Sequence, residues 1–200
     1  MRVVPVRPAA AGRTATWGDK FVAAALCGLL PPLLSCSRTE PARQVYTRAW
    51  AAFVAGDLET AGREASSYVP RSQKEPDSYW VLSLRLLDAE VLNAQSKWNP
   101  ARDLLLTPIP AKRELGQLEV RRLIDLAAVD LHLVGEAARV PEILAQARTS
   151  ARDPELRIRL DITEGLAAMS ARRPPAARQS FSAAADLAAE DGFPSGRRWR

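Results

Sequence analysis

Few residues in this chain carry the chemistry that a catalytic or metal site needs. Its 200 residues include one histidine, His132, and two cysteines, Cys27 and Cys36. Zinc sites need three or four protein ligands, and a histidine-based triad needs a nucleophile and an acid beside the histidine. We therefore expect His132 to be a structural residue of a long helix, and we expect neither a metal nor a cofactor.

Two pairs of carboxylates stand close together in the sequence, Asp88 with Glu90 and Glu136 with Glu142. Acid–base catalysis by such a pair needs a pocket and a reacting group within hydrogen-bond reach. No histidine or nucleophile accompanies either pair, and the sequence contains no G-x-S-x-G, H-E-x-x-H or phosphate-loop motif. Both pairs are expected to be solvated helix charges, and the chain is not expected to be an enzyme.

The formal net charge of +5 is concentrated at the two ends of the chain. Residues 1–36 hold four basic groups and one acidic group, and the last four residues hold three arginines. Residues 37–196 are nearly neutral, with 21 basic and 22 acidic groups. A nucleic-acid-binding protein carries its basic residues as a patch or stripe on a folded face. No nucleic-acid partner is therefore expected.

The N-terminal residues have the layout of an export signal. Four basic residues lie within residues 1–20, and an uncharged apolar run fills residues 21–34. This run is shorter than the roughly 20 residues of a membrane-spanning helix, and Pro31-Pro32 would break it. A basic region, a short apolar run and a small residue before the cut are typical of a secretory signal peptide.

The end of this signal, Leu33-Leu34-Ser35-Cys36, resembles the lipobox of bacterial lipoproteins. The resemblance implies a signal peptide at residues 1–35, cleavage before Cys36 and acylation of its thiol, with residues 36–41 as lipidated anchor and spacer. Several acyl chains give firm attachment where one is marginal. Because Ser37 follows the cysteine, the resemblance implies export and anchoring to the outer membrane, facing the periplasm or the surface. Plain secretion and an apolar N-terminal helix are the alternatives.

Residues 42–190 are expected to be all-α, because apolar residues recur at spacings of three and four. Asn99-Pro100 and Asp153-Pro154 each place a capping side chain before a proline that fits a first helical turn. Gly56 and Gly135 follow apolar runs, where a glycine ends a helix. The predicted hairpins pair residues 42–55 with 57–69, 78–95 with 99–107, 113–134 with 137–150, and 154–171 with 174–190. Residues 191–200 are expected to be a disordered basic tail.

The second helices of these hairpins share a period, since Ala61, Ala101, Val140 and Ala177 follow one another at steps of 40, 39 and 37 residues. Gly165 and Ala168 in the last hairpin, followed by Ala177, Phe181 and Ala184, resemble the tetratricopeptide repeat. The resemblance implies a right-handed α-solenoid of about four hairpins, with paired helices about 8–9 Å apart.

Three features depart from the tetratricopeptide pattern. The steps exceed the roughly 34 residues of that repeat, the first helices mostly lack its Trp and Tyr, and Arg172-Arg173 stands where its glycine turn is expected. Another α-helical bundle is therefore the alternative fold.

The first helices of a tetratricopeptide solenoid line its inner face. The resemblance places six residues on that face: Tyr46, Trp50, Phe53, Leu86, Glu90 and Asn93. The three aromatic residues are spaced four and three apart, on one side of a helix. Such an apolar groove suits an extended peptide or a partner helix. Packing against the neighbouring helix is the other interpretation and the commoner one for an aromatic stripe. The expected function is a lipid-anchored, non-catalytic scaffold that binds a protein or peptide.

A second resemblance implies a different role. Residues 84–90 followed by residues 101–106 are similar to the N-terminal repeats of bacterial proteins that end in a caspase-like CHAT peptidase domain. The resemblance implies, as the alternative function, a truncated sensor or regulatory arm whose catalytic domain is absent from this chain.

Overall fold

The computed structural model describes residues 41–68 and 78–190. This part of the chain contains eight α-helices and no β-strand. The helices are α1 (Ala42–Val54), α2 (Leu58–Tyr68), α3 (Tyr79–Ala94), α4 (Trp98–Leu106), α5 (Gly116–Asp130), α6 (Val140–Ser150), α7 (Pro154–Ser170) and α8 (Pro174–Glu190). Short 3₁₀ turns, η2 (Arg113–Leu115) and η3 (Ala137–Arg139), lead into α5 and α6. The prediction of an all-α chain is confirmed for these residues.

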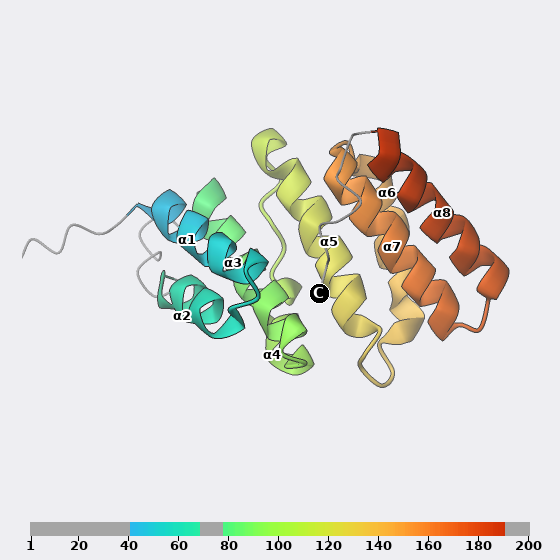
Figure 1. Cartoon of the computed structure of the whole chain (residues 1–200), viewed down its shortest axis with the longest axis horizontal. Helices are drawn as coiled ribbons and strands as arrows, with labels where there is room; N and C mark the ends of the chain where they lie inside the picture. Colours follow the sequence, from blue (N-terminus) through green and yellow to red (C-terminus); the bar gives the residue numbers. More distant parts are fainter. Residues whose placement is uncertain (1–40, 69–77, 191–200) are drawn as a thin grey trace, which may run out of the picture. The chain divides into compact units, whose positions relative to one another are not determined.

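Consecutive helices pack in pairs, α1 on α2, α3 on α4, α5 on α6 and α7 on α8. The first helices of successive pairs also contact one another, so that α1, α3, α5 and α7 form one continuous layer (Figure 1). In addition, α2, α4 and α6 each pack on the first helix of the following pair. The described residues therefore form four stacked helical hairpins, an arrangement consistent with an α-solenoid.

The hydrophobic core is concentrated in the middle of this stack. Ten of the sixteen residues of α3 and eleven of the fifteen residues of α5 are buried. In the last helix, α8, only Ala177 and Ala184 are buried. One core cluster extends from α3 to α7, and a second joins α1 and α2 to the opposite side of α3. Because α3 and α5 are covered on several sides, polar residues on these helices are drawn into the interior.

Three of the four hairpin turns share one backbone geometry. The second residue after each first helix enters the left-handed region, at Gly56 (φ 83°), Ser96 (φ 60°) and Arg172 (φ 56°). In each turn its N–H donates to the carbonyl three residues back, and the next N–H donates to the carbonyl five residues back. These bonds close the helix as in a Schellman motif. Ser96 and Arg172 adopt a conformation that costs a residue other than glycine roughly 1–2 kcal/mol.

The predicted hairpin boundaries agree closely with the structure except in the third pair. The helix predicted at residues 113–134 is wrong at both ends, because α5 follows a 3₁₀ turn and ends at Asp130. The chain then turns through Gly135, which has a φ of 88°. The Asp153 cap is confirmed, since its Oδ1 accepts from the N–H of Glu155 at 2.9 Å. The Asn99 cap is wrong, because α4 begins at Trp98 and includes Asn99.

Several predicted segments lie outside the described residues. They are the signal peptide at residues 1–35, the lipidation site Cys36 with most of the spacer, and the tail at residues 191–200. Within residues 41–68 and 78–190, no helix combines the length and the apolar content that a bilayer span requires.

In the last hairpin, α7 and α8 pack closely against each other at a glycine. Gly165 is a buried residue of α7, and the ring of Phe181 from α8 lies directly over its Cα. A Cβ at position 165 would lie 2.7 Å from both Cδ1 and Cζ of that ring. The two helices can therefore approach as closely as they do because residue 165 has no side chain.

We predict that Gly165→Ala destabilises the protein by about 1–3 kcal/mol, the usual cost of overpacking a filled site. A glycine-to-alanine change inside a helix ordinarily stabilises by about 0.5–1 kcal/mol. Urea unfolding measures the change, with Gly116→Ala as the control because a Cβ there meets nothing within 4 Å. A Gly165→Ala protein as stable as the Gly116→Ala protein would contradict the role assigned to this contact.

Candidate functional site

The layer of first helices brings four charged side chains together, and we call them the charge cluster. Glu90 comes from α3, Arg121 and Asp125 from α5, and Arg159 from α7. Glu90 and Arg121 are each 9% exposed and Asp125 is 5% exposed. Arg159 is half-buried, with 21% of its side chain exposed. Three neighbouring helices are thus joined through buried charge.

Glu90 is held from two sides within the charge cluster. Arg121 donates from Nε to Oε1 at 3.0 Å and from Nη2 to Oε2 at 2.7 Å. Nη2 of Arg159 lies 2.9 Å from Oε1 of Glu90 and 2.5 Å from Oδ1 of Asp125. Charges can be buried at this depth because each one is paired and hydrogen-bonded. The exception is Oδ2 of Asp125, which is buried and has no partner among the described residues.

The two carboxyl groups of the cluster respond differently to their surroundings. Burial acts to raise the pKa of Glu90, but Arg121 and Arg159 together outweigh it and lower this pKa to about 2. Burial dominates at Asp125 and raises its pKa to about 7, with Arg159 acting in the opposite direction. Glu90 therefore stays ionised at physiological pH, whereas Asp125 exchanges a proton near neutrality.

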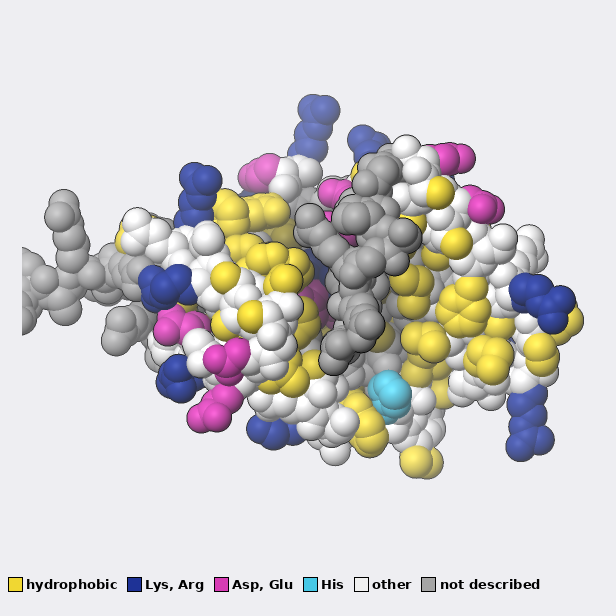
Figure 2. Space-filling model, in the orientation of Figure 1, with side chains coloured by type: hydrophobic (Ala, Val, Ile, Leu, Met, Phe, Trp, Pro, Cys, Tyr) yellow, Lys and Arg dark blue, Asp and Glu magenta, His cyan; other side chains and the backbone are white. Residues whose placement is uncertain are grey.

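Four aromatic residues adjoin the charge cluster and form what we call the aromatic surface: Tyr46, Trp50 and Phe53 from α1, and Trp80 from α3. The ring of Tyr46 lies 6.2 Å from that of Trp50 and 5.5 Å from that of Trp80, and Trp50 lies 5.8 Å from Phe53. All four are half-buried. Hydrophobic side chains gather over α1 and α3 in the space-filling view (Figure 2).

Arg121 links the aromatic surface to the charge cluster. Its Nη1 donates to the hydroxyl of Tyr46 at 3.3 Å, and its guanidinium lies 5.8 Å from the ring centre of Trp50. A guanidinium at this distance over an indole ring makes a favourable cation–π contact. Arg121 therefore pairs with Glu90 and also contacts the hydroxyl of Tyr46 and the ring of Trp50.

The residues predicted to line a groove fall into three groups. The three aromatic residues of α1 share one face and keep part of their surface, as their spacing predicted. Leu86 has no exposed surface and belongs to the main core cluster. Glu90 is buried in the charge cluster, and Asn93 is half-buried near the end of α3. The exposed part of the site therefore lies on α1 and Trp80.

The prediction of solvated carboxylates is wrong for Asp88 and Glu90, which are each 9% exposed. The reason is that α3 packs against α1, α2, α4 and α5, so most of its circumference is covered. Burial raises the pKa of Asp88 to about 6. In the second pair, Glu136 is half-buried and lies 2.7 Å from Nη2 of Arg102, whereas Glu142 is exposed.

Sequence reasoning missed Trp80, Arg121, Asp125 and Arg159. One signal was present, because Arg121 and Arg159 are the sixth residues of α5 and α7, one hairpin apart. This signal becomes visible only once the helices are aligned by hairpin.

His132, the lone histidine, is exposed and stacks on Trp98, with ring centres 4.9 Å apart. Among the described residues, no group of three or more His, Cys, Asp or Glu side chains is arranged to hold a metal ion. The prediction that His132 belongs to a long helix is wrong, because α5 ends at Asp130 and His132 lies in the following turn. His132 packs on an aromatic ring of α4.

Together, the charge cluster and the aromatic surface present exposed apolar rings, whereas their charged groups are already paired. The two arginines of the charge cluster are already paired with its two carboxylates, so a free ion gains little there. The partly exposed rings of the aromatic surface can still bury area against another molecule. No family model, curated protein or solved structure matches this chain. Its function therefore has to be argued from these residues.

We predict that stability falls by about 2 kcal/mol between pH 5 and pH 8 because of Asp125. Its pKa in the folded protein is raised to about 7, so its contribution is fully present below the unfolded pKa near 4 and is lost as the pH rises through 7. Urea unfolding at several pH values measures this change. Asp125→Asn, which mimics the protonated side chain, should flatten the profile by that amount.

The difference between the two profiles isolates Asp125, because Asp88 and His132 are present in both proteins. Parallel profiles for the wild-type and Asp125→Asn proteins would contradict a raised pKa at this position. Asp153→Asn serves as the control, since Asp153 caps α7 in an exposed position.

Proposed function

We propose that this protein is a lipid-anchored, non-catalytic module that binds a protein or peptide partner. Its described part would act as a scaffold of tetratricopeptide-like hairpins, and its anchor would hold the scaffold at the cell envelope. The observation that carries the proposal is the aromatic surface on the layer of first helices.

The order of helix contacts supports the tetratricopeptide-like scaffold. Each first helix contacts its own partner helix and the first helices before and after it. The periodic positions of the second helices, Ala61, Ala101, Val140 and Ala177, are all buried, at 0%, 0%, 0% and 2% exposure. Small residues at these points let paired helices approach closely. Stacked units of this kind present an extended surface on one side.

The aromatic surface supports partner binding. Tyrosine and tryptophan supply large contact areas with little loss of side-chain entropy, and they are common at the centres of protein interfaces. Here Arg121 fixes Tyr46 and Trp50 before any partner arrives, so little ordering remains to oppose binding. Apolar side chains of an extended peptide or a helix are the complementary chemistry.

The position of the anchor supports a partner at the membrane. Six residue steps separate Cys36 from Ala42, the first residue of α1, and fully extended they span at most about 20 Å. Acylation of Cys36 would therefore keep the aromatic residues of α1 near the membrane. Confinement of this kind raises the effective concentration of the module toward partners in the same membrane.

We predict that a photo-reactive benzoylphenylalanine at position 53 cross-links a discrete partner in envelope membranes of cells that make this protein. Trp50→Ala should reduce the cross-linked product by about tenfold, because an aromatic residue central to an interface contributes 1–2 kcal/mol or more. The control is the same residue at position 185, which is exposed on α8. Equal products from positions 53 and 185, or none from position 53, would contradict the proposal.

We predict that Cys36 carries acyl chains in the mature protein. Metabolic labelling with palmitate and mass spectrometry of the N-terminal peptide should both detect them. Cys36→Ser should abolish the label and release the protein from the membrane fraction. Cys27→Ser is the matched control, since Cys27 belongs to the predicted signal peptide and should leave labelling unchanged. Labelling that persists in Cys36→Ser would refute the anchor.

A further inference from the structure

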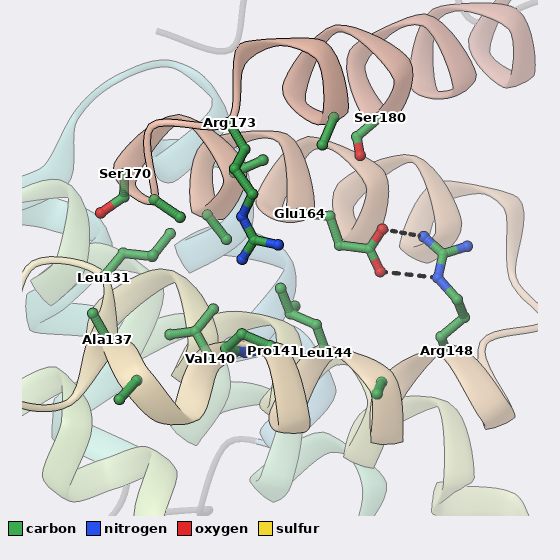
Figure 3. A pocket seen from close by; sticks show the side chains of 16 residues that line it. Leu131, Ala137, Val140, Pro141, Leu144, Arg148, Glu164, Ser170, Arg173 and Ser180 are labelled. Carbon is green, nitrogen blue, oxygen red and sulfur yellow. Dashed lines mark hydrogen bonds and ion pairs between the residues drawn. The ribbon is translucent and has the colours of Figure 1, made fainter.

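A cavity of about 650 Å³ lies in the last two hairpins. It is lined by α6, α7 and the beginning of α8, with the end of the α5–α6 connection at one side (Figure 3). Its volume falls within the range of roughly 300–1,000 Å³ that is common for small-molecule sites. It shares no residue with the charge cluster or the aromatic surface.

The lining of this cavity is largely apolar. Seven of its sixteen lining residues are alanines, and Leu131, Val140, Pro141 and Leu144 add larger apolar groups. Alanine side chains leave the space between α6 and α8 open, and they offer no hydrogen bond. In the middle of α6 and α7 the backbone groups are already used within those helices, and free backbone groups are confined to the helix ends.

One ion pair crosses the cavity and is internally satisfied. Arg148 donates from Nε to Oε1 of Glu164 at 2.9 Å and from Nη2 to Oε2 at 2.6 Å (Figure 3). It also donates to Oδ1 of Asp161 at 2.5 Å. Because Arg148 already faces two carboxylates, it has little remaining attraction for an added anion.

Arg173 is different from Arg148. Its side chain extends into the cavity and ends between Val140 and Glu164 in the view (Figure 3). Among the described residues it has no ion-pair or side-chain hydrogen-bond partner. Arg173 is an exposed residue, so an apolar cavity that is open to solvent carries one unneutralised cation. Ser170 and Ser180 also line the cavity and supply hydroxyl groups.

We propose that this cavity binds a single-chain amphiphile with a carboxylate head, such as a fatty acid. The carboxylate would pair with Arg173, and guanidinium–carboxylate contacts are short, charge-assisted and often bidentate. The acyl chain would lie along the alanines between α6 and α8, where its burial is favourable in proportion to the apolar area covered.

The lining favours an acyl chain over a peptide. Every peptide residue carries a C=O and, except for proline, an N–H, and these groups must keep hydrogen-bond partners when water is removed. In the described part of the chain, the only unpaired polar side chains that line the cavity are two hydroxyl groups and Arg173, too few for the regularly spaced backbone groups of an extended peptide. An acyl chain makes no such demand.

The test is calorimetric titration of the full 200-residue chain carrying Cys36→Ser, so that no attached acyl chain competes. Decanoate, kept below its micelle concentration, should bind with a stoichiometry of one. Arg173→Gln should weaken decanoate binding by about tenfold, the usual effect of removing one charge-assisted contact. It should leave the binding of uncharged decanol unchanged.

Two further variants make the result specific to the cavity. Arg172→Gln is the matched control, because Arg172 is the adjacent exposed arginine and does not line the cavity. The double change Ala145→Leu with Ala176→Leu fills the space from two exposed positions, so it should abolish binding while the helical circular dichroism is unchanged.

The proposal is overturned if decanoate does not bind, or if Arg172→Gln and Arg173→Gln weaken binding equally. It is also overturned if the double leucine variant binds as the parent does. A decapeptide with a free C-terminal carboxylate that binds more tightly than decanoate, with the same dependence on Arg173, would reassign the cavity to a protein tail. None of these outcomes bears on partner binding at the aromatic surface, so the two proposals fail separately.

Discussion

The described structure depends on the pairing of Glu90 with Arg121 and Arg159 across three neighbouring helices. Each of these groups would be costly to bury alone, and removing one partner from a buried pair typically costs about 3–5 kcal/mol. The pairing is possible only when α3, α5 and α7 lie at one particular register. The charge cluster therefore constrains how successive hairpins stack, which apolar packing of alanine and leucine stripes leaves less well specified.

Arg121 connects this buried ion pairing to the aromatic residues at the surface. Its guanidinium is fixed by both carboxylate oxygens of Glu90, and from there it contacts the hydroxyl of Tyr46 and the ring of Trp50. The position of the aromatic rings on α1 is thus tied to an ion pair between α3 and α5. A surface prepared in this way loses less entropy on binding than one that must be ordered by its partner.

The sequence predicted the hairpins well because the signals for helices are local. Apolar spacing, the Asp153 cap and Gly56 each act within one or two turns of the chain. The differences arose where a local signal did not match the helix or turn that forms. Asn99 precedes a proline and has the chemistry of a cap, but α4 begins one residue earlier. Ser96 and Arg172 take the left-handed position of a turn that sequence patterns assign to glycine.

The charge cluster could not be predicted in the same way, because its partners are brought together by tertiary packing. Glu90 and Arg121 are 31 residues apart, and Asp125 and Arg159 are 34 apart. A helical pattern read alone assigns every charge to the solvent, yet α3 and α5 are covered on several sides. In stacked hairpins a charged residue should therefore be compared with its equivalents in the neighbouring repeats. An arginine at the same position of two successive first helices, as at Arg121 and Arg159, is then a reason to look for a carboxylate between them.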